Sequence, residues 1–166
     1  MAVQHTRAHR PSSRWSIAQG AFDIHKIWKV PRVGARAALS RDGVDAPPEI
    51  GAFFALLSDA VAHGVTIVAH NAVFDLGRLK ATAEAHGGLP PLPIDKTKML
   101  CTMQSSRKAC GLLDSRRDPR YLKVPKLEEL HEHLFGAKPA GTLHEALADV
   151  RVLSRCYAEG RRRQLW

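Results

Sequence analysis

The stretch Val65-Thr66-Ile67-Val68-Ala69-His70-Asn71-Ala72-Val73-Phe74-Asp75 decides the fold class of this chain. Its first five residues form a short, apolar run that is rich in β-branched side chains, which is typical of a strand buried in a sheet. His70 and Asn71 then turn the chain, and the apolar residues that follow recur with helical spacing to about His86. The pattern predicts a buried strand that runs directly into a helix, with Asp75 near the strand's carboxyl end.

Two longer helices are expected on either side of this unit. The first opens at Pro47-Pro48, carries one apolar stripe and closes at Gly64. The last is expected over about 143–159, with Thr142 as its cap and Gly160 as its end. Three apolar residues of this last helix are expected to face inward: Leu147, Val150 and Leu153.

The connecting segments are less regular. Residues 94–104 are ambiguous between strand and helix, and residues 105–125 are expected to form a basic loop. Residues 126–135 form a short amphipathic helix stopped by Gly136, and residues 3–9 alternate weakly, as a strand does. Because strands precede helices along the chain, we expect an α/β fold with helices packed on a sheet. A length of 166 residues suits a single domain, residues 1–166.

Positive charge is concentrated in two blocks of the sequence. The whole chain carries a net charge of +9, with a pI of about 9.9. Residues 1–46 contain 8 basic and 3 acidic groups (+5), and residues 96–126 contain 9 and 2 (+7). Residues 47–95 between them contain 2 and 5 (−3). These blocks favour a polyanionic partner, and a solvated basic surface is the alternative interpretation.

Cysteine usage and hydropathy indicate the compartment. The three cysteines form no C-x-x-C pair, which favours reduced thiols. No apolar run approaches the roughly 18 residues that a membrane span needs, and the first 20 residues do not resemble a signal peptide. We therefore expect a cytoplasmic protein without a membrane partner.

Three residues are candidates for metal-dependent chemistry. Asp75 and Asp149 each follow an apolar run, and His144 precedes Asp149 by five residues. Carboxylates brought together from distant segments can hold divalent cations, and a nearby histidine can accept a proton from water. Each residue also has a simpler interpretation, since an aspartate in the first turn of a helix is favoured by the helix dipole.

The histidines of His131-Glu132-His133 are not expected to share a metal. Alternate residues on a helix point apart, so both histidines are predicted to lie on the surface. His144-Glu145 does not begin a zinc-protease motif either, because Ala148 stands where the second histidine would be.

Five segments, in order, resemble the DEDDh 3′–5′ exonucleases, the proofreading-exonuclease superfamily. Residues 67–75 resemble the second motif of that family, and His144 to Asp149 resembles its third motif, H-x4-D. Leu127-Glu128-Glu129-Leu130 resembles the segment before the third motif. Two further segments resemble the I-H-G-I region and the lead into the next helix: 21–27 and 45–49.

The resemblance implies a ribonuclease-H-like fold, with a mixed sheet and flanking helices. It implies two-metal hydrolysis of phosphodiesters with Mg²⁺ or Mn²⁺, using Asp75 and Asp149 as metal ligands and His144 as the general base. The partner would be the 3′ end of single-stranded DNA or RNA. On this basis the expected nucleic-acid-binding residues are His70, Asn71, Arg107, Lys108, Arg116, Arg117, Arg120 and Lys123.

One motif of the family is absent from the sequence. The family carries D-x-E on its first strand, and residues 1–166 contain no D-x-E. Phe22-Asp23-Ile24-His25 imitates it with histidine in place of glutamate, but no apolar strand precedes that segment. We therefore expect the first two strands to be missing, hydrolysis to be impaired, and the unpaired strands to favour self-association. The alternatives are a catalytically inactive nucleic-acid-binding pseudoenzyme or a non-catalytic interaction domain.

Overall fold

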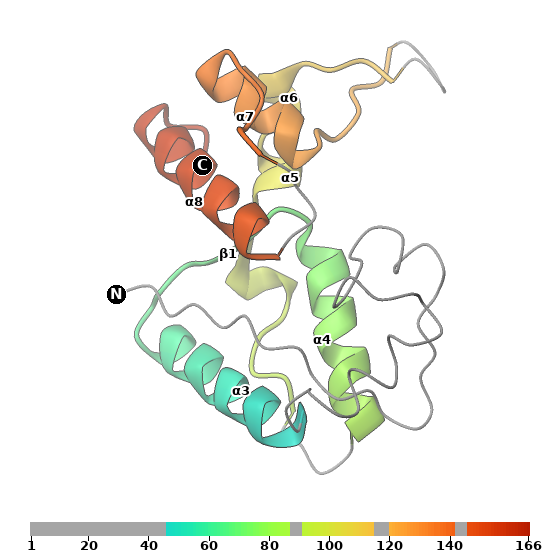
Figure 1. Cartoon of the computed structure of the whole chain (residues 1–166), viewed down its shortest axis with the longest axis vertical. Helices are drawn as coiled ribbons and strands as arrows, with labels where there is room; N and C mark the ends of the chain where they lie inside the picture. Colours follow the sequence, from blue (N-terminus) through green and yellow to red (C-terminus); the bar gives the residue numbers. More distant parts are fainter. Residues whose placement is uncertain (1–45, 87–90, 115–119, 142–145) are drawn as a thin grey trace.

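The computed structural model describes residues 46–86, 91–114, 120–141 and 146–166. These residues form six α-helices, one 3₁₀ turn and two short strands (Figure 1). The elements are, in order, α3 (Ala46–Ala62), β1 (Ile67–Ala69), α4 (Ala72–His86), η2 (Lys96–Lys98), β2 (Met99–Cys101), α5 (Thr102–Ser105), α6 (Arg107–Cys110), α7 (Leu127–Phe135) and α8 (Ala146–Arg162).

The two strands are parallel. Ile67 pairs with Met99 and Ala69 with Cys101, so the carboxyl ends of β1 and β2 lie at the same edge. The α/β class predicted from the sequence is confirmed by this strand pair and its surrounding helices. The segment that was ambiguous contains the 3₁₀ turn, β2 and the start of α5 in succession.

The first core lies between α3, α4 and the sheet. Its buried members come from the α3 stripe and from the segment before η2: Ile50, Phe54, Leu57 and Ile94. Leu76 and Leu79 of α4 pack against it, together with Ile67 and Met99 of the strands. In both strands only Ala69 is fully buried, so this small sheet is covered incompletely by the described residues.

The second core lies between α7 and α8. Leu130 and Leu134 of α7 contact Val152 and Cys156 of α8, and all four side chains are buried. The apolar spacing of residues 126–135 predicted this face of α7 correctly. Gly136 adopts a left-handed conformation, with φ of 74°, and ends the helix as expected.

The carboxyl-terminal residues close the second core. Trp166 packs against the buried Gly160 and lies parallel to the ring of Tyr157, with centroids 6.3 Å apart. Leu165 donates its N–H to the Gly160 carbonyl at 2.9 Å. Glu159 pairs with Arg162 and Arg163, which lowers the pKa of its carboxyl to about 2.

Three predictions about α8 and the segment before α7 were wrong. Gly160 does not end α8, which continues to Arg162, because the glycine serves instead as the contact surface for Trp166. Val150 does not face inward, since its side chain is 55% exposed and α8 presents Val152 and Cys156 to the core. Residues 105–125 are not entirely loop, because they contain α6 and the bridge between Leu113 and Leu122.

His131 was also predicted wrongly as a surface residue. Its side chain is buried, and its ring contacts Phe135 with centroids 4.5 Å apart. Its Nδ1 lies 2.8 Å from the Ala137 carbonyl, so this nitrogen carries the proton and donates it. His133 is exposed, as predicted.

The remaining predictions on local structure fall outside the described residues. They concern residues 3–9, the segments 21–27 and 45–49 in part, and the cap at Thr142. Within the part of the chain that the structure describes, no helix is both long enough and apolar enough to cross a membrane.

Candidate functional site

A cavity of about 360 Å³ lies at the carboxyl ends of the two strands. His70 and Asn71, which follow β1, line it together with Met103, which follows β2. The opposite wall comes from the segment 124–128 and from Asp149 in the first turn of α8. This edge of a parallel sheet is where α/β proteins bind ligands. In Figure 1 the first turn of α8 lies near β1, in agreement with the presence of Asp149 among the residues that line the cavity.

His70 connects the two sides of this cavity. Its Nε2 lies 3.0 Å from the Pro125 carbonyl, and its Nδ1 lies 3.0 Å from the Thr102 hydroxyl. Its own carbonyl accepts the N–H of Met103 at 3.1 Å. The end of β1, the end of β2 and the segment before α7 are therefore held together through one residue.

These contacts define the protonation state of the ring. Burial lowers the pKa of His70, although the Pro125 carbonyl and the nearby Asp149 carboxylate act in the opposite direction. The ring is therefore neutral near pH 7. Since a carbonyl only accepts, Nε2 carries the proton, and Nδ1 accepts from Thr102. Both ring nitrogens of His70 are thus engaged within the protein.

The two candidate metal ligands have different positions. Asp149 lines the cavity and is close enough to His70 to influence its pKa. Asp75 lies one turn into α4, where its N–H donates to the Asn71 carbonyl at 3.1 Å. It is not among the described residues that line the cavity. Burial raises the pKa of Asp75, so a nearby cation would relieve the cost of its ionised form.

The structure brings Asp149 together with His70 and Asn71 in one cavity, whereas the resemblance implies that Asp149 meets Asp75 and His144 there. The predicted general base, His144, lies outside the described residues. Among the residues that are described, no three His, Cys, Asp or Glu side chains gather closely enough to hold a metal ion. These residues alone therefore do not fit a complete two-cation site.

Part of the wall formed by 124–128 was expected from the resemblance, since Leu127-Glu128-Glu129-Leu130 resembles the segment before the third motif, whereas Val124 and Pro125 were not expected there. Glu129 accepts the Lys126 N–H at 2.8 Å through Oε2 and pairs with the Lys123 ammonium through Oε1. Burial opposes ionisation of Glu129, but these contacts outweigh it and lower the pKa of the carboxyl. They fix the start of α7, and with it Lys126 and Glu128, which line the cavity. For Val124 and Pro125 the sequence signal was the turn-favouring proline before an amphipathic helix.

The predicted nucleic-acid-binding residues occupy different environments. Lys108 and Arg120 are exposed, whereas Arg107 is half-buried and donates through Nε to the Leu122 carbonyl at 2.7 Å. Lys123 is half-buried and paired with Glu129. Arg116 and Arg117 lie outside the described residues. Two of these cations therefore also organise the segment that carries them.

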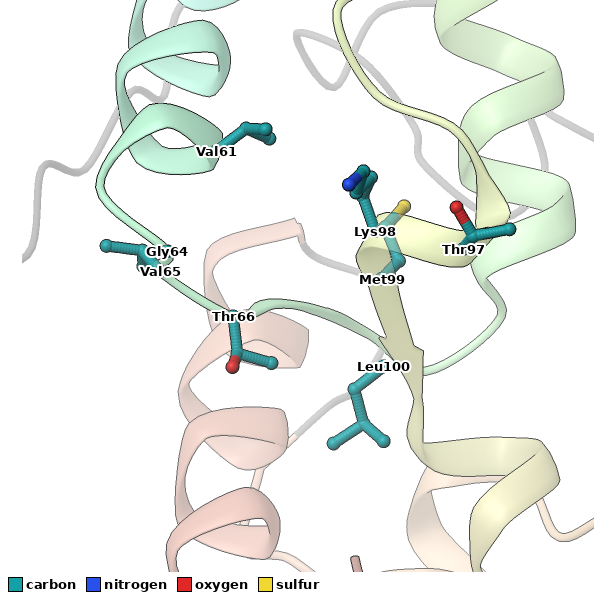
Figure 2. Close-up of a pocket in the computed structure, with 8 residues that line it drawn as sticks. All are labelled: Val61, Gly64, Val65, Thr66, Thr97, Lys98, Met99 and Leu100. Atoms are coloured by element: carbon teal, nitrogen blue, oxygen red, sulfur yellow. The ribbon is translucent and has the colours of Figure 1, made fainter.

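A second cavity, of about 400 Å³, lies at the opposite, amino-terminal ends of the strands (Figure 2). Its lining is mostly apolar, with Val61 and Val65 on one side and Met99 and Leu100 on the other. Lys98 is its charged member. Carboxylates do not line the described part of this cavity, so it lacks the chemistry proposed below for the first.

Comparisons with known proteins identify no relative. No family model matches the chain, and no curated protein or solved structure is significantly similar to it.

Proposed function

We propose that this chain is related to the DEDDh 3′–5′ exonucleases and that its first cavity receives the 3′ end of a single-stranded nucleic acid. The observation that carries the proposal is that His70 and Asn71, in one motif, line the same cavity as Asp149, in another. These motifs are far apart in the sequence, and the resemblance requires them to converge. The cavity also lies at the sheet edge where such a site is expected.

The roles proposed for the remaining residues follow from the resemblance. Asp75 and Asp149 would bind Mg²⁺ or Mn²⁺, and His144 would accept a proton from the attacking water. The raised pKa of Asp75 supports its part, because a desolvated carboxylate gains from a nearby cation. His70 is proposed to shape the cavity, since both of its ring nitrogens already have protein partners.

Hydrolysis by the 166-residue chain is proposed to be weak. Two aspartates supply little negative charge for two cations, and the sequence provides no D-x-E. A pseudoenzyme that binds nucleic acid without cleaving it is the second candidate, favoured by the lack of a three-ligand cluster among the described residues.

Two measurements test the proposal. Fluorescence anisotropy with labelled single-stranded DNA should give an affinity that falls steeply with added salt, because bound phosphates release counterions. A 5′-labelled oligonucleotide incubated with Mn²⁺ should be shortened slowly from its 3′ end by the wild-type chain and not by Asp149→Asn. Binding without any difference between these two proteins would favour the pseudoenzyme, and absence of binding would overturn both candidates.

A further inference from the structure

A short antiparallel hairpin leads into the wall of the first cavity. Its arms pair at Leu113 and Leu122. The N–H of Asp114 donates to the Tyr121 carbonyl at 3.0 Å, and the N–H of Lys123 donates to the Leu112 carbonyl at 2.8 Å. In Figure 1 these arms project from the end of the molecule that carries α5 to α7, away from α3.

Side-chain contacts hold this hairpin to the helices beneath it. The Arg107 guanidinium, on α6, donates to the Leu122 carbonyl at 2.7 Å. The Lys123 ammonium pairs with Glu129 on α7, and the same carboxylate accepts the N–H of Lys126. The second arm is therefore fixed both to α6 and to the start of α7.

The hairpin holds an aromatic side chain in solvent. Tyr121 is 63% exposed, although it stands on a backbone with defined hydrogen bonds. The next two residues of this arm, Leu122 and Lys123, are half-buried, in contrast to Tyr121. An exposed ring on an anchored strand loses little conformational entropy when it binds a flat ligand.

The charge of the segment indicates which flat ligand it would attract. Residues 96–126, which contain the hairpin, carry nine basic and two acidic groups. A basic segment with an aromatic ring is the usual combination for single-stranded nucleic acid, whose phosphates are attracted while its bases stack. Tyr121 is also close to the cavity: it lies four positions before Pro125, a separation of at most about 14 Å of extended chain.

We propose that the Tyr121 ring is a stacking platform for a nucleotide base a few positions from the 3′ end that occupies the cavity. The inference rests on the proposed function, since it places the 3′ end there. It assigns Tyr121 a positioning role: the ring holds the strand in one register while the terminal phosphodiester lies beside Asn71 and Asp149.

The experiment uses single-stranded DNA with 2-aminopurine, an adenine analogue whose fluorescence is quenched by stacking, at successive positions from the 3′ end. EDTA prevents cleavage during the titration. We expect quenching to peak at one internal position for the wild-type chain. Tyr121→Ala should abolish that quenching and weaken binding about fivefold or more. Tyr121→Phe retains the ring and should retain both properties.

Phe53→Ala provides the matched control. Phe53 is also an exposed aromatic residue, 37% exposed, but it lies on α3, away from the hairpin. Its removal should leave affinity and quenching unchanged. Salt-sensitive wild-type binding that is unaffected by Tyr121→Ala would overturn the stacking platform and leave the proposed function standing. No binding by the wild-type chain would overturn both.

Discussion

The two cores of this protein differ in how completely they are closed. Between α7 and α8, four side chains are buried and Trp166 covers the end of the cluster. Between α3, α4 and the sheet, the α3 stripe is buried, but the described strand residues other than Ala69 remain partly exposed. The core between α7 and α8 is therefore closed more completely than the core beside the short sheet. The first cavity lies between the two regions and takes residues from each.

The largest expected effect tests this difference directly. Leu130→Ala should destabilise the protein by about 2–5 kcal/mol, because its side chain is completely buried in the closed core. Leu100→Ala in β2 should cost clearly less, since Leu100 is half-exposed beside the second cavity. Urea unfolding of both variants gives the comparison. Equal losses would mean that the sheet is packed as tightly as the helical pair.

Gly160→Ala probes the closure by Trp166. A methyl group at this position would lie 2.0 Å from the Trp166 ring, so the ring must move. We expect a loss of about 1–3 kcal/mol, as for other overpacked sites. Gly77→Ala in α4 is the matched control, since nothing lies within 4 Å of its added methyl group. It should stabilise α4 by up to about 1 kcal/mol. A harmless Gly160→Ala would show that Trp166 does not seal the core.

His70 should make stability depend on pH where the two regions meet. Burial lowers its pKa in the folded protein, so the unfolded chain takes up the proton first as pH falls below about 6.5. The neutral His70 ring therefore contributes its full stabilisation above the unfolded pKa. This stabilisation is lost as the pH falls from the unfolded pKa to the lower pKa of the folded state. His70→Gln should reduce the stability lost between pH 7.5 and 5.5, measured by urea unfolding. An identical pH profile in the variant would contradict the buried neutral ring.

The substitution Asp75→Asn has the smallest expected effect. It distinguishes the effect of Asp75 on stability from its proposed role in metal binding. Burial raises the pKa of Asp75, so ionised Asp75 costs stability in full above its folded pKa, and that cost shrinks to zero as pH falls from the folded pKa to the unfolded pKa. Asp75→Asn should slightly raise the melting temperature at pH 7 without metal, whereas Glu84→Gln, at an exposed site on the same helix, should not. Mn²⁺ should stabilise the wild-type chain more than Asp75→Asn. The same Mn²⁺ response in both proteins would remove Asp75 from the proposed metal ligands.

Local patterns predicted the elements well where one periodicity dominated. The strand before His70, the helix after Asn71 and the α7 helix up to Gly136 followed from apolar spacing and glycine punctuation. The prediction that Gly160 ends α8 was wrong for a physical reason: a glycine that ends a helix and a glycine that contacts an aromatic ring look alike in a sequence.

The site was predictable only in part. Motif order pointed to His70, Asn71 and Asp149, which line one cavity. The buried position of His131 and the contribution of Val124 and Pro125 to the cavity wall depend on tertiary packing, which local spacing does not contain. The ion pair between Lys123 and Glu129 was hidden for the same reason, since charge counts do not reveal partners.

The contacts of His70 also have a consequence for the order of folding. Its two ring nitrogens reach partners that are 32 and 55 residues away in the sequence. Contacts between distant residues form slowly, because a long loop must close before they are made. The α7–α8 pair and the α3–α4 unit can each assemble from nearer neighbours, so we expect the His70 bridge to form last. The cavity would then mature only once both halves are in place, and a chain arrested midway would contain folded helices but no binding site.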